Sequence, residues 1–94
     1  MPPGTSIQPP FDAHLSAVVE MARADLSRRL SVAPADVTLV EVRSVIWPDG
    51  GLGCPRPGMV YPQVQVEGLL IRLRVAGRGY DYHSGGNRAP FLCE

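Results

Sequence analysis

The chain has 94 residues, enough for one small domain, and its apolar content of 45% supports a hydrophobic core. Nine Arg balance nine acidic residues and there is no Lys, so the formal net charge is zero. This balance argues against nucleic acid or an anionic membrane as the main partner, since both attract clustered positive charge.

The first ten residues hold four Pro and predict an extended, mobile arm over 1–10, followed by a single domain over 11–94. This arm has neither the basic start nor the apolar stretch of a secretory signal. No apolar run in the chain approaches the roughly 20 residues of a membrane-spanning helix. The compartment stays open: the protein is cytoplasmic, or it is exported by a signal that this sequence does not contain.

Residues 11–30 predict an amphipathic helix. Apolar side chains recur there at helical spacing, at Phe11, Leu15, Val18, Val19, Ala22, Leu26 and Leu30. Asp12 can cap the start of this helix or serve as an acidic residue in its first turn, and Pro34 sets the latest position at which the helix can end.

Three or four strands are expected after the helix. The alternating segments are 36–46, 68–76 and 80–83, with 90–93 as a short closing strand. A turn at 77–79 joins the second and third segments as a hairpin. One helix followed by antiparallel strands defines a two-layer α+β domain.

The alternation also predicts which strand residues face the helix. Those expected on the helix-facing side are Val40, Val42, Leu69, Ile71, Leu73, Val75, Tyr80 and Tyr82. The opposite face is expected to lie in water. Its Arg, Asp and His side chains could bind an anion, but cross-strand ion pairs are favoured. Its residues are Glu41, Leu70, Arg72, Arg74, Asp81 and His83.

The segment W-P-D-G-G-L-G-C-P-R-P-G-M, residues 47–59, is a Gly/Pro-rich loop that also holds the only Trp and one of two Cys. Trp47 has two interpretations. In the first, Trp47 and Met59 pack against the sheet edge and anchor the loop. In the second, Trp47 is an exposed aromatic residue in a recognition loop. The first is favoured, because a lone Trp in a small domain is usually buried.

The loop motif, with Y-x-Q-V at 61–64, Y-x-Y-H at 80–83 and the late Cys93, resembles a family of small uncharacterised bacterial domains. The likeness covers roughly residues 23–93. Members of that family often follow a lipoprotein or secretion signal, so the resemblance implies an envelope or secreted location. It supplies no catalytic residue and no ligand. This chain departs from the family in having no export signal and in having Pro62 before Gln63.

The two cysteines have a structural interpretation as a disulfide. A bond between Cys54 and Cys93 would tie the closing strand to the loop. It requires an oxidising compartment, which the resemblance favours. Free buried thiols are the alternative.

Metal, catalytic and phosphate sites are not indicated. Zinc would need four ligands, and the available ones are Cys54, Cys93, His83, His14 and Asp81. No C-x-x-C or H-x-x-x-H pair supplies the local chelate that such sites usually show. A nucleophilic Cys54 would need an activated thiolate with a base in reach, and the sequence shows neither. The run G-G-L-G is not a phosphate loop, because Pro55 and Pro57 follow it and no Lys is present.

We therefore predict a noncatalytic binding or inhibitory module, without metal or cofactor, that presents the loop over 47–61 to a protein partner. The candidate contact residues are Trp47, Asp49, Arg56 and Tyr61. One alternative is a thiol- or metal-dependent protein that uses Cys54, His83 and Cys93. Another is a structural domain of a larger assembly, with the sheet edge as the contact.

Overall fold

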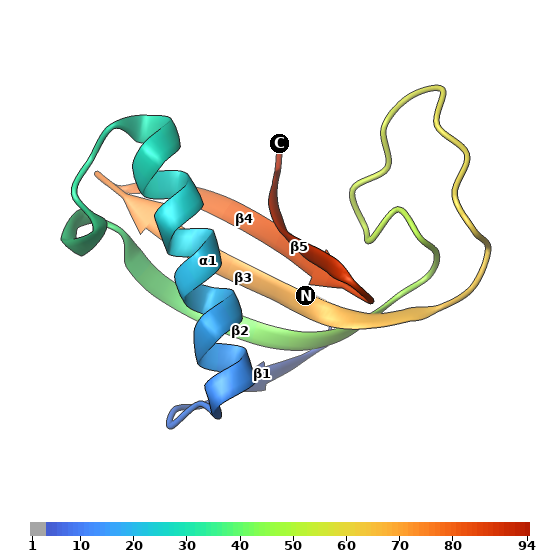
Figure 1. The fold of residues 1–94 in the computed structure, drawn as a ribbon, viewed down its shortest axis with the longest axis horizontal. Coiled ribbons are helices and arrows are strands. Elements are labelled where there is room, and N and C mark those ends of the chain that lie inside the picture. The colour runs from blue at the N-terminus through green and yellow to red at the C-terminus, as the bar shows by residue number, and fades with distance from the viewer. Residues whose placement is uncertain (1–3) are drawn as a thin grey trace.

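The computed structural model describes residues 4–94 and has one helix packed across one face of a five-stranded antiparallel sheet (Figure 1). The elements are β1 (Thr5–Ile7), α1 (Ala13–Leu30), the short 3-10 helix η1 (Pro34–Asp36), β2 (Thr38–Trp47), β3 (Val66–Val75), β4 (Arg78–Gly85) and β5 (Arg88–Cys93). The strands follow one another in the order β1-β2-β3-β4-β5. The α+β class is confirmed, but the expected count of three to four strands was wrong.

The fifth strand, β1, comes from the segment that was expected to be a mobile arm. Thr5 pairs with Ser44, and Ile7 pairs with Val42. The Arg43 guanidinium also donates a hydrogen bond of 2.7 Å to the Gly4 carbonyl. Part of the expected arm is therefore an edge strand of the sheet, while residues 1–3 lie outside the described part of the chain.

Asp12 caps helix α1, which is one of the two roles expected for it. The Asp12 carboxylate accepts a hydrogen bond of 2.8 Å from the Leu15 backbone N–H, which satisfies one of the free donors of the first turn. The helix starts at Ala13 rather than at Phe11, because the cap residue itself has an extended backbone. Ser31, in the left-handed conformation, ends it.

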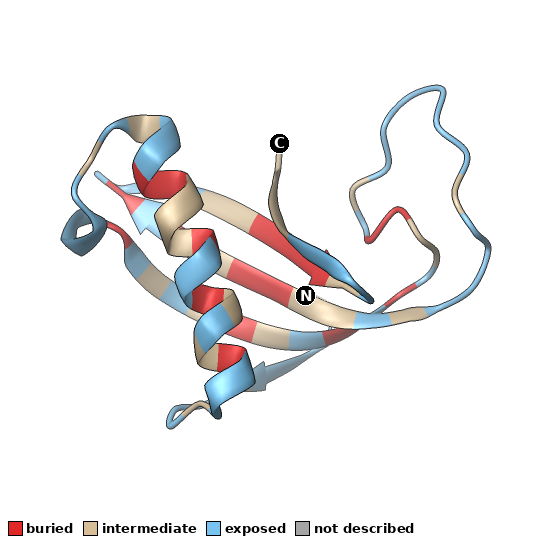
Figure 2. Cartoon of the chain, in the orientation of Figure 1, coloured by how far each residue is buried: buried red, intermediate tan, exposed pale blue. Residues whose placement is uncertain are grey.

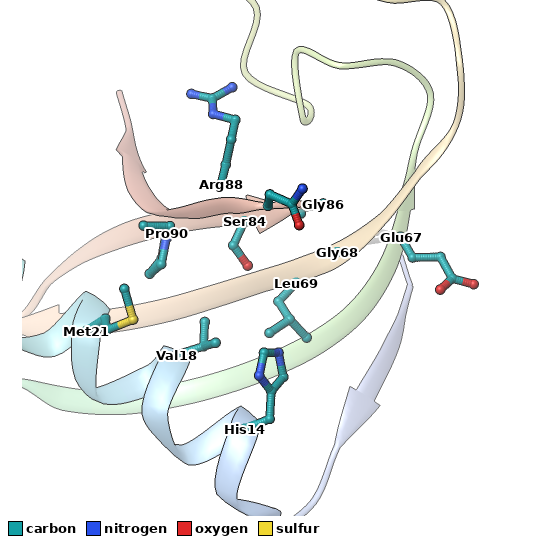
Figure 3. Close-up of a pocket in the computed structure, with 13 residues that line it drawn as sticks. His14, Val18, Met21, Glu67, Gly68, Leu69, Ser84, Gly86, Arg88 and Pro90 are labelled. Carbon is teal, nitrogen blue, oxygen red and sulfur yellow. The ribbon is translucent and has the colours of Figure 1, made fainter.

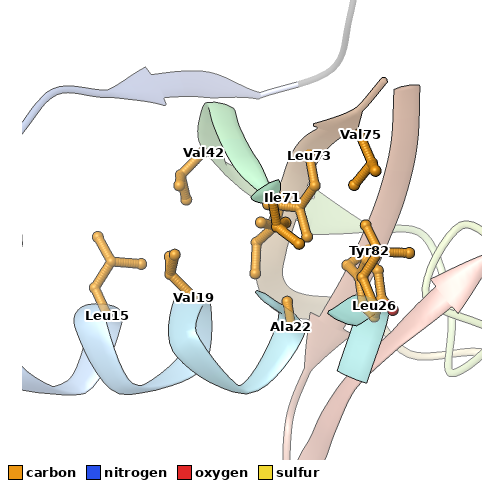
Figure 4. Close-up of a cluster of buried hydrophobic side chains, with 10 residues drawn as sticks. Leu15, Val19, Ala22, Leu26, Val42, Ile71, Leu73, Val75 and Tyr82 are labelled. Carbon is orange, nitrogen blue, oxygen red and sulfur yellow. The ribbon is translucent and has the colours of Figure 1, made fainter. Parts of the chain in front are cut away.

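The main core lies between α1 and the sheet (Figure 4). Its helix residues are Leu15, Val19, Ala22 and Leu26, and its sheet residues include Val42, Ile71, Leu73, Val75 and Tyr82. The predicted helix stripe and the predicted inward residues of β3 and β4 are confirmed.

Strand β2 departs from the predicted alternation at Val40, which is 44% exposed. The pairing with β3 shifts between Leu39 and Glu41, so one extra residue is inserted in β2. Such a bulge moves every preceding side chain to the other face. Leu39 packs on the main core in place of Val40, and the expectation for Val40 was wrong.

The hairpin between β3 and β4 is tighter than expected. Val75 pairs with Arg78, so only Ala76 and Gly77 form the turn. Both have positive φ, of 50° and 82°, as a two-residue hairpin turn of this twist requires. The predicted turn at 77–79 was therefore displaced by one residue, and β4 starts two residues earlier than expected.

One polar contact joins α1 to the sheet at the edge of the main core. The Tyr82 hydroxyl donates a hydrogen bond of 2.6 Å to the Asp25 carboxylate, which also pairs with Arg29 at 2.6 Å. Burial acts to raise the pKa of Asp25, but the hydrogen bonds from Tyr82 and Arg29 outweigh it and hold this pKa below 3.8. Burial raises the pKa of Tyr82 above 10.0, and its hydrogen bond to Asp25 raises it further.

Asp25→Asn is expected to remove part of the acid sensitivity of the fold. Because the folded pKa of Asp25 is depressed, its contribution is present above about pH 4 and is lost as the pH falls through the folded value. We expect the variant to be about 1–2 kcal/mol less stable at neutral pH, with a difference that shrinks in acid. Urea unfolding at a series of pH values measures this, and curves that stay parallel from neutral to acid would contradict it.

Candidate binding loop

The residues between β2 and β3, 48–65, form a long loop that extends beyond one end of the sheet (Figure 1). The base of this loop is held by a second hydrophobic cluster on the sheet face that α1 leaves uncovered. The buried members of this cluster are Val45, Trp47, Leu52 and Leu70, with Val66 and Phe91 packed against them. The expectation that this face lies in water was therefore wrong at the loop end. Leu70 is buried there because Leu52 folds back over it.

Trp47 is the centre of the second cluster and is only 5% exposed. Its indole N–H donates a hydrogen bond of 2.8 Å to the Ser84 carbonyl on β4. Gly68 makes this possible, because a Cβ at that position would lie 2.6 Å from Trp47 Nε1 and would collide with the Ser84 carbonyl. The structural interpretation of Trp47 holds, since so little of its indole reaches the surface.

His83, on β4, connects the loop to the sheet through contacts with both Trp47 and Leu52. The two rings stack with centroids 4.6 Å apart and an angle of 9° between their planes. His83 Nδ1 lies 2.6 Å from the Leu52 carbonyl oxygen. A carbonyl can only accept, so Nδ1 carries the proton in this contact. His83 was expected among exposed ion pairs, but the loop covers it.

Some of the charged residues expected on the sheet face opposite α1 form ion pairs, outside the area that the loop covers. Arg72 lies 3.6 Å from the Glu41 carboxylate and 3.5 Å from that of Asp81. His83 is not part of this group, because it lies under Leu52 and Trp47. The predicted ion pair between Arg72 and Asp81 is therefore confirmed, whereas Arg74 and His83 pair with no carboxylate within residues 4–94.

A disulfide joins Cys54 to Cys93, with Cα atoms 5.9 Å apart. It links the loop to the last residue of β5, as the structural interpretation proposed. Both sulfurs are used in this bond, so neither cysteine is a thiol or a thiolate ligand here.

The two arms of the loop are hydrogen-bonded to each other at two places, one near its base and one next to its tip. The Gly50 backbone N–H donates to the Pro62 carbonyl at 2.9 Å, and the Arg56 N–H donates to the Tyr61 hydroxyl at 3.0 Å. The Asp49 carboxylate closes a local turn by accepting from the Gly51 N–H at 2.8 Å. Of the predicted contact residues, Asp49 and Tyr61 thus serve the internal structure of the loop.

The tip of the loop is the turn Arg56–Met59, in which the Met59 N–H donates to the Arg56 carbonyl at 3.2 Å. Pro57 and Gly58, with φ of 80° at Gly58, are the residue types that a type II turn requires. All residues from 55 to 60 are exposed, as the pale blue outer part of the loop in Figure 2 shows. Met59 is 60% exposed and Val60 is 94% exposed. Met59 was expected to pack against the sheet edge, and this was wrong because Leu52 fills that place.

Arg56 is therefore the predicted contact residue that does lie at the exposed tip. Sequence reasoning missed Met59 and Val60 as surface residues, because apolar side chains are ordinarily assigned to the core. The available signal was their position directly after Pro57-Gly58, since tight turns of this type and the residues beside them lie on the surface of a domain.

Two glycines of the loop give a matched test of the packing between the loop and Trp47. Gly53 and Gly58 both have positive φ, of 72° and 80°, so alanine strains either backbone by about 1–2 kcal/mol. A Cβ at Gly53 would also collide with the Trp47 ring, whereas a Cβ at Gly58 meets nothing within 4 Å. Gly53→Ala is expected to be less stable than Gly58→Ala by about 1–3 kcal/mol in chemical denaturation. Equal losses would show that Gly53 does not pack against Trp47.

A hollow of about 430 Å³ lies elsewhere, between α1 and the turn that joins β4 to β5 (Figure 3). His14, Val18 and Met21 form its helix side. The charged groups at its rim, on Glu67 and Arg88, point away from each other. A ligand site needs polar groups that converge on one point, and this hollow does not provide them.

No group of three or more metal-ligating side chains comes together within residues 4–94. In the same part of the chain, no helix is both long enough and apolar enough to cross a membrane.

The fold and the loop define a small α+β domain in which a disulfide and a buried Trp hold a long exposed loop against the sheet. The chain belongs to the family described as a domain of unknown function, DUF8738, whose model matches residues 19–93. No curated protein and no solved structure matches this chain.

Proposed function

We propose that this protein is a noncatalytic module that binds another protein through the tip of its loop, residues 55–60. One observation carries the proposal: Met59 and Val60 are strongly exposed on a loop whose two arms are fastened. Arg56 lies on the same tip and adds a side chain that is enriched at binding hot spots.

The energetics of the loop favour binding over a purely structural role. Adjacent apolar side chains in water gain free energy when a partner covers them. A loop that is already ordered loses little conformational entropy on association, which leaves more of that gain as affinity. The disulfide, the Trp47 packing and the two proline residues flanking Arg56 all reduce this entropy loss.

The disulfide also bears on the compartment. Such bonds persist in oxidising surroundings, so the proposed place of action is the bacterial cell envelope or the exterior. A thiol- or metal-dependent function would first require reduction of the Cys54–Cys93 bond.

Site-specific photo-crosslinking tests the proposal. A photoreactive residue at position 60 is expected to crosslink a discrete protein in envelope extracts. The control is the same residue at position 46, because Ile46 is 64% exposed but lies on β2 outside the loop. A product from position 60 alone supports loop binding, whereas no product, or the same product from both positions, contradicts it.

A further inference from the structure

We infer that the partner is a serine endopeptidase with an apolar primary specificity pocket, and that the loop occupies its active-site cleft as a substrate would, with Met59 in that pocket. This inference rests on the proposed function and names the class of partner. It makes the protein an inhibitor of proteolysis.

The shape of the tip suits an enzyme cleft. A cleft receives a convex segment of several residues, and the exposed stretch 55–60 stands clear of the sheet (Figure 2). Residues 59–63 form no helix or strand, and the Val60 N–H and C=O make no hydrogen bond to any other residue within 4–94. These groups are therefore free to pair with the backbone of an enzyme, as an added strand does.

The positions of the prolines select one peptide bond in the tip. Cys54, Arg56 and Tyr61 are each followed by Pro, whose ring obstructs attack on the bond before it. Gly58 has no side chain to enter a specificity pocket, and the short rings of Pro55 and Pro57 are too rigid to extend into one. Val60 is branched at Cβ and stiff, whereas Met is unbranched and adapts to an apolar slot. This leaves the bond between Met59 and Val60.

The hydrogen bonds between the two arms of the loop explain why the Met59–Val60 bond would resist net cleavage. Attack by the enzyme serine on the Met59 carbonyl would break the bond to Val60, giving an acyl-enzyme ester and a free Val60 amine. The Tyr61–Arg56 and Gly50–Pro62 hydrogen bonds hold that amine near the ester. Its attack on the ester re-forms the peptide bond and releases the serine hydroxyl.

The disulfide adds a covalent link across the same bond. Cys54 precedes the Met59–Val60 bond and Cys93 follows it, so a hydrolysed chain would remain one molecule. It also favours serine enzymes as partners, because an oxidising compartment works against the free thiolate of a cysteine protease.

Inhibition assays with the purified, disulfide-bonded chain test the inference. The panel contains a chymotrypsin-like, a subtilisin-like, an elastase-like and a trypsin-like enzyme, each with a small chromogenic substrate. We expect at least one enzyme with an apolar pocket to be inhibited at about 1 μM or below. Met59→Lys is expected to weaken that inhibition by about tenfold or more and to create inhibition of the trypsin-like enzyme.

Met21→Lys is the matched control, because Met21 is also exposed, at 48%, but lies on α1. It is expected to leave inhibition unchanged. Mass spectrometry after long incubation is expected to show intact chain, or a chain heavier by one water and divided at Met59–Val60 only after reduction. Absence of inhibition at about 10 μM across the panel, or rapid cleavage at other bonds of the tip, overturns the inference.

The two proposals fail in different ways. A position-60 crosslink to a protein that is not a protease, together with no inhibition, overturns the inference and leaves the binding function in place. A lack of any position-60 crosslink overturns the binding function itself.

Discussion

Replacing Cys54 and Cys93 together by alanine is expected to lower the free energy of unfolding by about 4 kcal/mol. The two residues are 39 positions apart, and a bridge of that span restricts the unfolded chain by about this amount in the loop-entropy model. For a domain of this length the loss corresponds to a fall in Tm of about 15–30 °C. Thermal and urea unfolding, followed by circular dichroism, measure both quantities.

The single variant Cys54→Ala distinguishes the effect of losing the disulfide from the effect of losing both cysteine side chains. It breaks the same bridge while Cys93 keeps its sulfur, so its stability is expected to lie close to that of the double variant. Intact mass after alkylation, without and with reductant, shows whether the wild-type thiols are blocked before unfolding is measured. A loss below about 1 kcal/mol in the double variant would contradict the structural role of the bond.

The helix could be predicted from the sequence because its evidence is local. The spacing of Leu15, Val19 and Leu26 defines one face, and Asp12 marks its start without reference to any other segment. The inward face of β3 follows in the same way from alternation. These elements depend on residues that are close neighbours in the chain.

The features that were missed depend on distant residues. The bulge at Val40 exists only in relation to β3, and nothing in the local sequence of β2 marks it. Thr5–Ile7 pairs with residues of β2 that lie far along the chain, and the segment around Thr5–Ile7 is rich in Pro. Short sequence windows carry no information on either contact.

The site was predicted in part for a related reason. The disulfide was one of two alternatives left open for the cysteines, because spacing alone cannot decide pairing. Trp47 was favoured as a core residue, but its partners Leu52 and His83 could not be named. Leu52 is a single apolar residue within a Gly/Pro-rich run, and the loop must close before its packing is defined.

Two independent interactions hold the loop against the sheet, the disulfide and the cluster around Trp47. The disulfide fixes position 54 to the end of β5 and acts mainly on the unfolded chain. The cluster around Trp47 fixes Leu52 to the sheet and acts in the folded state. Loss of the cluster should therefore loosen the loop base even when the disulfide is intact.

Trp47→Ala is accordingly expected to lower the free energy of unfolding by about 3–5 kcal/mol, the usual range for a fully packed Trp. It removes the stacking partner of His83 and the hydrogen bond from the indole N–H to the Ser84 carbonyl. Hydrogen exchange is expected to speed up at the amides of Leu52 and Cys54, because their turns rest on the indole. Urea unfolding gives the stability, and exchange measured by mass spectrometry reports on the loop.

Met59→Ala provides the control for Trp47→Ala, because Met59 is apolar and lies in the same loop but is 60% exposed. Its stability is expected to stay within about 0.5 kcal/mol of the wild type, with unchanged exchange at the loop base. The proposed binding function instead requires Met59→Ala to weaken partner binding. If the two variants were equally stable, the indole of Trp47 would not be a core group, and Trp47 would have to be an exposed recognition residue instead.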